Sequence, residues 1–259
     1  MTGLTISGDF GNRQSFARVV PSYTWDDIIG SPYAISDYVW CVPSVVFCSV
    51  AIGSWASCWI RSNPAIGTDE EVVALRKKLN GMQMRLMLDF VPNHSSLDSP
   101  YVRSHPEYYV RVVRGQRIDP LRYSPEGIAF GGGDNNCWID TLQWNYWSAD
   151  LRQFLVRVLF KIAGMCDGVR CDTAALILSA NFEKNWGGLL RPSGFSPPPT
   201  EFWADAIGQI RARHPAFMFL AESYGESGPP LLRCGFDFVY DMAPYDLLGT
   251  ARSLGSSTH

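Results

Sequence analysis

The stretch MRLMLDFVPNH, residues 84–94, decides the fold, because a short apolar run ends there in a cluster of polar residues. Two further stretches have the same construction: GVRCDTA at residues 168–174 and AFMFLAE at residues 216–222. Each apolar run is short enough to be a buried strand. In a parallel α/β barrel the catalytic residues lie at the carboxyl ends of the strands. The three stretches therefore predict an α/β fold of the (β/α)8, TIM-barrel type.

The polar clusters contain the side chains that chemistry on a sugar linkage requires. Asp89 and His94 belong to the first cluster, Asp172 to the second and Glu222 to the third. Cleavage of a glycosidic bond needs one acid that protonates the leaving oxygen and one carboxylate that attacks or stabilises the anomeric carbon. A glycosidase is therefore one function that this pattern favours.

The three clusters resemble the signatures of the alpha-amylase family, glycoside hydrolase family 13. The signature Asp-x-Val-x-Asn-His matches residues 89–94, Gly-x-Arg-x-Asp-x-Ala matches 168–174, and an apolar pair before Glu matches 220–222. The resemblance extends from about residue 30 to residue 248. It implies a retaining glycoside hydrolase or transglycosylase that acts on alpha-glucosidic bonds of alpha-glucans or oligosaccharides.

The resemblance assigns the catalytic roles. Asp172 falls on the family's nucleophile position and Glu222 on its acid/base position. Arg170 precedes Asp172 by two residues, so both side chains point to one side of the strand, and a guanidinium there would hold the nucleophile ionised. Glu222 has the opposite need, a raised pKa that keeps its proton. A structural salt bridge at a strand end is the alternative for both acids.

Substrate and metal positions also follow from the resemblance. His94 would hydrogen-bond the sugar in the cleavage subsite, Asp89 would brace the cluster from below, and Tyr33 would stack on the sugar; structural roles are the alternatives for His94 and Tyr33. Asn93 is a calcium ligand in many amylases, whereas other members keep this Asn without the metal, so calcium stays open. No other cofactor is implied.

We expect one catalytic domain over residues 1–259. Residues 91–147 are irregular and rich in Pro, Gly, Tyr and Asp, and loops of this length are usually functional. They lie where the resembled family has an enlarged loop subdomain after the third strand. The resemblance also places four strands, near residues 84–89, 168–169, 216–220 and 236–240, as the third to the sixth of the barrel.

Helices alternate with these strands, which predicts a parallel sheet. Thr68 and Glu71 form a capping box at the start of a helix that ends at Asn80-Gly81. A second helix starts near Ser148, with apolar residues on one face between Leu151 and Ile162. Thr200 is expected to cap a third helix, and a short helix is expected around Tyr245.

Residues 39–60 form an apolar run without charge that interrupts the family pattern. The length meets the criterion of ~20 residues for a membrane-spanning helix, but Pro43, Gly53 and scattered Ser make it a poor helix. Three explanations stay open: translated non-coding sequence such as a retained intron, a genuine loop insertion, and a lipid-facing element.

The barrel is expected to be incomplete. Residues 1–29 contain no convincing strand that would be the first or second, and 11 residues follow Leu248, too few for the last two strands. The family's third carboxylate, an Asp after a His near the seventh strand, has no counterpart. Since that Asp orients the sugar, its loss should lower activity by orders of magnitude. A catalytically inactive amylase-like binding or assembly module is therefore the alternative function.

The composition limits the partners and the cellular location that we expect. A net charge of −3 gives no reason to expect a nucleic-acid or membrane-surface partner, so the substrate is the one partner expected. Residues 1–20 show no signal-peptide pattern, which favours a cytoplasmic over a secreted location. The seven Cys lack metal-ligand spacing, and an odd number fits buried thiols in a reducing compartment.

Overall fold

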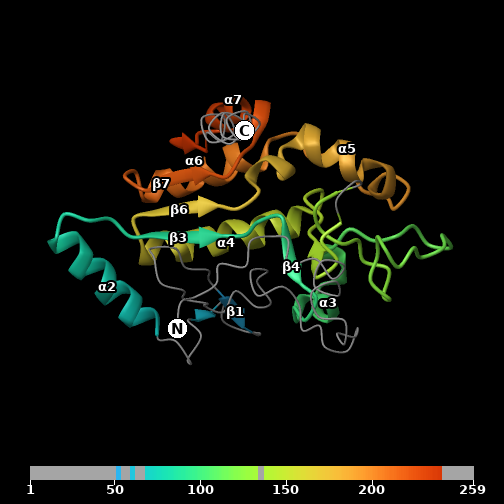
Figure 1. Cartoon of the computed structure of the whole chain (residues 1–259), viewed down its shortest axis with the longest axis horizontal. Helices are drawn as coiled ribbons and strands as arrows, with labels where there is room; N and C mark the ends of the chain where they lie inside the picture. The colour runs from blue at the N-terminus through green and yellow to red at the C-terminus, as the bar shows by residue number, and fades with distance from the viewer. Residues whose placement is uncertain (1–50, 54–58, 62–67, 134–136, 241–259) are drawn as a thin grey trace, which may run out of the picture.

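The computed structural model describes residues 51–53, 59–61, 68–133 and 137–240. A parallel sheet lies at its centre, with the strands in the order β3 (Met87–Phe90), β6 (Gly168–Cys171), β7 (Met218–Ala221) and β8 (Phe238–Val239). The strands adjoin in chain order, and helices connect them, as in a (β/α)8 barrel (Figure 1). The predicted parallel sheet is confirmed, and within the described residues it forms four of a barrel's eight strands.

Among the described helices, α2 (Asp69–Gly81) leads into β3, while α4 (Ala149–Met165) and α6 (Phe202–Arg213) lie in the connections between strands; α2 and α4 begin where the sequence predicted. α2 has the complete capping box: Glu71 N donates to Thr68 Oγ1 at 3.2 Å and Thr68 N donates to Glu71 Oε2 at 2.7 Å. α4 is capped by Ser148, which accepts from the backbone N–H of Leu151 at 3.3 Å.

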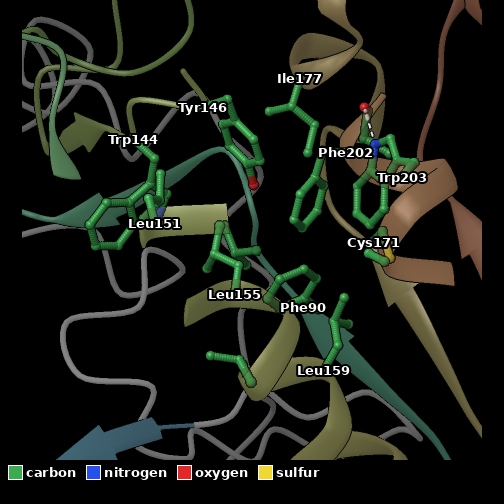
Figure 2. Close-up of a cluster of buried hydrophobic side chains, with 14 of the residues drawn as sticks. Phe90, Trp144, Tyr146, Leu151, Leu155, Leu159, Cys171, Ile177, Phe202 and Trp203 are labelled. Atoms are coloured by element: carbon green, nitrogen blue, oxygen red, sulfur yellow. Dashed lines mark hydrogen bonds between the residues drawn. The ribbon is translucent and has the colours of Figure 1, made fainter. Parts of the chain in front are cut away.

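The core lies between one face of the sheet and the helices α4 and α6 (Figure 2). Alternate strand residues, among them Phe90 and Cys171, point into it and are fully buried. The predicted apolar face of α4 is buried as a whole: Leu151, Phe154, Leu155, Val158, Leu159 and Ile162. Trp203 of α6 completes the layer, and its indole N–H donates to the carbonyl of Ala174 at 2.9 Å. Burial of each large side chain stabilises the fold by about 1.5–3 kcal/mol.

The prediction that Thr200 caps a helix is wrong. Glu201 is the N-cap of α6 and makes no side-chain cap bond, while the Thr200 hydroxyl donates to Asp205 Oδ2 at 2.5 Å. The Glu201 carboxylate instead accepts from the backbone N–H of Ser179, at 3.0 and 3.2 Å. That N–H begins α5 (Ser179–Leu190), a helix that the sequence did not predict.

Short elements complete the connections around the sheet. Between β6 and α5 lies the 3-10 helix η3 (Ala174–Ile177). After β7 the chain forms η4 (Gly225–Ser227) and α7 (Gly228–Arg233), and then enters β8. α7 contacts both β8 and η3, so this end of the described sheet is covered by helical turns.

Residues 91–147 follow β3 and return to α4. Here β4 (His94–Ser96) pairs with β5 (Thr141–Gln143) in antiparallel fashion, and α3 (Tyr101–Ser104) and η2 (Pro106–Tyr108) lie between them. The segment has its own aromatic packing, with the rings of Tyr109 and Trp144 stacked at 4.5 Å. Whether it is a separate subdomain stays a prediction.

The apolar run 39–60 lies mostly outside the described residues, as does the helix predicted around Tyr245. The described parts are β1 (Ala51–Gly53) and β2 (Trp59–Arg61), which form an antiparallel pair. Across the described ranges, no helix combines the length and the apolar character that crossing a membrane requires. The origin of the run stays a hypothesis.

Candidate active site

Backbone pairing brings Asp172 and Glu222 to the same level of the sheet. Asp172 N donates to the carbonyl of Phe90 at 2.9 Å, and Glu222 N donates to the carbonyl of Cys171 at 2.9 Å. The ladder therefore continues one residue beyond β6 and β7. Since side chains alternate along a strand, Asp172 lies on the same face as Arg170, opposite the apolar core.

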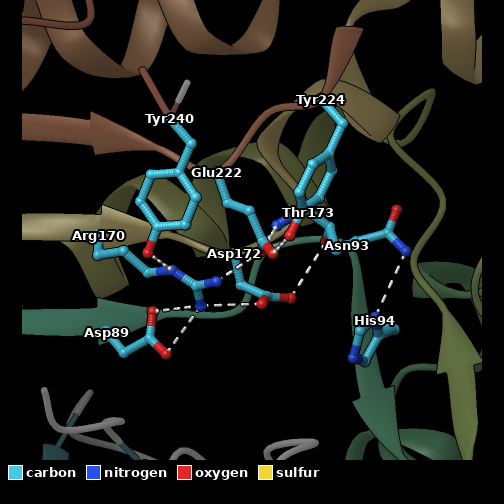
Figure 3. A network of polar contacts seen from close by, with 9 residues as sticks. All are labelled: Asp89, Asn93, His94, Arg170, Asp172, Thr173, Glu222, Tyr224 and Tyr240. Carbon is cyan, nitrogen blue, oxygen red and sulfur yellow. Dashed lines mark hydrogen bonds and ion pairs between the residues drawn. The ribbon is translucent and has the colours of Figure 1, made fainter. Parts of the chain in front are cut away.

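The Arg170 guanidinium connects three carboxylates from three strands (Figure 3). Its Nη1 lies 3.1 Å from both oxygens of Asp89, which is its partner in the strand register, and 2.9 Å from Asp172 Oδ1. Its Nη2 lies 2.7 Å from Glu222 Oε2. The four side chains are buried, each with 11% or less of its surface exposed. The cluster binds the predicted catalytic residues into one network.

One cation among three buried carboxyls leaves excess negative charge in the cluster, and this shifts the pKa values of Asp172 and Glu222 in opposite directions. Burial raises the pKa of Asp172 well above its usual value; Arg170 opposes this, and the charges of Glu222 and Asp89 add to it. Burial would also raise the pKa of Glu222, but hydrogen bonds from Asp172, Arg170, Tyr224 and the N–H of Thr173 outweigh it, and the pKa is lowered.

This distribution differs from the expectation of an ionised Asp172 and a protonated Glu222. The physical reason is the number of donors. Glu222 Oε2 accepts from Arg170 and from Thr173 N at 2.8 Å, and Oε1 accepts from the Tyr224 hydroxyl at 2.5 Å. Asp172 has fewer donors and is more deeply buried, so the free protein stabilises the charge of Glu222 first.

Thr173 links the two acids. It is a β-branched residue in the left-handed region, with φ 45° and ψ 34°, a conformation that is sterically costly and that concentrates at functional sites. From this position its N–H reaches Glu222, and its hydroxyl donates to Asp172 Oδ2 at 3.2 Å. The strained residue therefore holds both carboxyls.

His94 opens β4 beside this cluster. Its ring is buried, lies 3.4 Å from Asn93 Nδ2, and meets the ring of Trp138 edge-on at 5.3 Å. Burial lowers the pKa of His94 to about 4, although the charge of Glu222 acts against this. The imidazole is therefore neutral at pH 7, with one ring nitrogen as a donor and the other as an acceptor.

The surroundings of Asn93 do not fit a calcium ion. Calcium takes 6–8 oxygen ligands, whereas Asn93 is fully buried and both ends of its amide contact Gln143: Oδ1 accepts from Nε2 at 3.2 Å and Nδ2 donates to Oε1 at 3.3 Å. In the described ranges, no three or more His, Cys, Asp and Glu side chains cluster as metal ligands would. We derive no step through calcium.

Sequence reasoning missed Thr173, Tyr224 and Tyr240. The Arg170 Nε donates to the Tyr240 hydroxyl at 3.3 Å, and the Tyr240 ring centre lies 5.7 Å from the guanidinium carbon. Thr173 follows Asp172 directly and Tyr224 follows Glu222 by two residues, so their positions in the sequence could have indicated them. No sequence feature marks Tyr240 as part of the cluster. Tyr33 lies outside the described residues, so its stacking role stays a prediction.

A large cavity lies elsewhere. Its volume is about 890 Å³, and it is lined from α4, α6 and the segment 196–200, including Arg152, Phe160 and Arg213. None of the cluster residues lines it. The Arg170 cluster at the strand ends is therefore separate from this cavity.

Four parallel strands with an Asp, an Arg and a Glu in one buried cluster at their carboxyl ends are consistent with part of a (β/α)8 barrel of the alpha-amylase type. The structure is similar to the crystal structure of an alpha-amylase from Lactobacillus plantarum, with a TM-score of 0.52 and 26% identity over 76% of this chain and 42% of that one. An Anoxybacillus alpha-amylase matches with a TM-score of 0.51 and 16% identity over 73% and 37%.

The chain therefore spans about two fifths of the length of these solved structures. No family model matches the sequence, and no curated protein does. The resemblance to the alpha-amylase family that the three signatures carried is confirmed by the structural similarity.

Proposed function

We propose that this chain carries the catalytic strands of a retaining glycoside hydrolase or transglycosylase for alpha-glucosidic bonds of alpha-glucans or oligosaccharides. The observation that carries the proposal is the Arg170 guanidinium, which joins Asp172 at 2.9 Å and Glu222 at 2.7 Å. The similarity to a solved alpha-amylase supports the substrate class.

In the proposed reaction Asp172 attacks the anomeric carbon while Glu222 gives its proton to the leaving oxygen. The bond to the leaving sugar breaks as the bond to Asp172 Oδ forms. Glu222, now a carboxylate, then takes a proton from a water or from an acceptor hydroxyl, which attacks the anomeric carbon and releases Asp172. Two inversions give net retention of configuration. Carboxylates and a hydroxyl suffice, so no organic cofactor enters the scheme.

The resting pair has to rearrange before this reaction. In a retaining glycosidase the acid is protonated and the nucleophile ionised, whereas in the free protein the pKa of Asp172 is raised and that of Glu222 is lowered. Binding of a sugar therefore has to raise the pKa of Glu222 relative to that of Asp172, so that Glu222 carries the proton. Arg170 contacts both acids, so it stabilises the ionised nucleophile in that state.

The remaining predicted site residues take supporting roles. His94 is neutral and adjoins the cluster, so it can exchange hydrogen bonds with a sugar hydroxyl. Asp89 accepts two hydrogen bonds from Arg170 and thereby orients the guanidinium. Tyr33 is proposed to stack on the sugar.

Hydrolysis of a chromogenic alpha-glucoside by the purified full chain tests the proposal. Asp172→Asn and Glu222→Gln should each lower kcat by about 10³-fold or more, since residues of one catalytic unit fail together. Asp150→Asn and Glu70→Gln make the same chemical changes at exposed positions and should leave the rate unchanged. An inactive amylase-like module predicts equal rates for the wild type and all four variants, and that outcome would refute the proposed enzymatic function.

A further inference from the structure

The Tyr224 hydroxyl is hydrogen-bonded to one of the two carboxyl oxygens of Glu222, the proposed acid/base. It follows Glu222 by two residues, directly before η4, and its hydroxyl donates to Glu222 Oε1 at 2.5 Å (Figure 3). A distance this short is typical of a hydrogen bond to an ionised oxygen. Nothing in the reaction scheme above uses this residue.

The two oxygens of Glu222 have different partners. Oε2 is held by the buried Arg170 and by the N–H of Thr173. The partner of Oε1, Tyr224, is 55% exposed, whereas Glu222 itself is 9% exposed. We therefore infer that a substrate approaches Glu222 from the side of Oε1. The Tyr224 hydroxyl blocks access to this oxygen in the free protein.

We propose that Tyr224 is a positioning residue: its hydroxyl holds Glu222 Oε1 in the free protein and yields that oxygen to the glycosidic oxygen when substrate binds. This inference rests on the proposed function for the role of Glu222, but the contact itself can be tested without any substrate. The exposed ring can turn away from the carboxylate, whereas Arg170 and Thr173 stay fixed in the cluster.

The contact has an electrostatic consequence. A donor to a carboxylate stabilises the ionised form, so the Tyr224 hydroxyl acts with Arg170 to lower the pKa of Glu222 against the effect of burial. Removal of the hydroxyl withdraws that stabilisation, so the pKa of Glu222 should rise and its proton should be lost at higher pH.

Carboxyl titration by ¹³C NMR, on protein labelled at Glu Cδ, measures this directly. Glu222→Gln assigns the resonance by removing it. In Tyr224→Phe the titration midpoint of Glu222 should rise by about one pH unit, since a charge-assisted hydrogen bond is worth roughly that much. Tyr108→Phe is the matched control; Tyr108 lies in η2, stacked on His105 at 4.5 Å, and its loss should leave the midpoint in place.

Kinetics give the second readout. The basic limb of the kcat/KM profile should move upward by a similar amount in Tyr224→Phe and stay unchanged in Tyr108→Phe. An unshifted Glu222 resonance would overturn the inference whether or not the protein is active. If the resonance shifts but the wild-type protein shows no turnover, the Tyr224–Glu222 contact is supported and the proposed function is refuted. Failure of the inference and failure of the proposed function are therefore distinguishable.

Discussion

Replacement of Arg170 by Met removes the cation that contacts Asp89, Asp172 and Glu222 and keeps most of the side-chain volume. The three carboxyls stay in their buried positions, each with 11% or less of its surface exposed. Removal of one partner of a buried ion pair costs about 3–5 kcal/mol because the remaining charge is left without compensation. We expect a loss of this size in the free energy of unfolding at pH 8.

The loss should depend on pH, and its sign can be worked out. Arg170 lowers the pKa values of Asp172 and Glu222, so without the guanidinium the folded variant binds more protons than the folded wild type. The stability of the variant relative to wild type then rises as pH falls. The destabilisation of Arg170→Met relative to wild type should therefore be largest at pH 8 and smaller at pH 5, where the acids take up protons.

Urea unfolding followed by tryptophan fluorescence at pH 5 and pH 8 measures both quantities. Arg85→Met is the matched control, because the Arg85 side chain is 66% exposed and lies 3.8 Å from Asp167, which keeps Arg76 at 2.9 Å; a loss of about 0–1 kcal/mol is expected. Equal small losses in the two variants, or a loss in Arg170→Met that is the same at both pH values, would refute the reasoning about the cluster.

Three further predictions concern stability, and denaturant unfolding of each variant measures them. Thr68→Ala removes the cap of α2 and should cost about 1 kcal/mol; no loss would show that the capping box is not formed. Trp203→Ala empties a fully buried site and should cost about 3–5 kcal/mol, and a loss below that of Thr68→Ala would contradict the packing. Asp167 accepts from Leu86 N and Arg76 Nε, both at 2.9 Å, and these bonds overcome burial and lower its pKa, so Asp167→Asn should cost about 1.5–3 kcal/mol at neutral pH. Since a lowered pKa contributes stability that is lost as pH falls, that difference should narrow in acid, and a constant difference would count against it.

Much of the fold follows from local sequence. The capping box at Thr68 and the cap at Ser148 satisfy backbone donors within four residues, so neighbouring residues alone determine where α2 and α4 begin. The strands were predictable for a related reason, because each is a short apolar run with polar residues at or near its carboxyl end, although β3 continues through Asp89 to Phe90. The positions of Arg170 and Asp172 on one face required only the alternation of a strand.

The errors and omissions depend on contacts between distant residues. Thr200 has the residue type of a cap, but Glu201 takes the position and bonds to Ser179, 22 residues away. Tyr240 reaches Arg170 across 70 residues, and no local pattern marks it. The directions of the pKa shifts of Asp172 and Glu222 depend on how many donors each acid meets, which only the assembled site determines.

The Arg170 cluster also affects the register in which the strands of the sheet pair. Asp89 and Arg170 are direct partners in the register of β3 and β6, and Asp172 and Glu222 follow at the next level. A slip of β6 by one residue would turn Arg170 and Asp172 together toward the apolar side and leave Asp89 and Glu222 without a cation. Misaligned strands are thus penalised by charge, so the residues proposed for chemistry also select the correct alignment during folding.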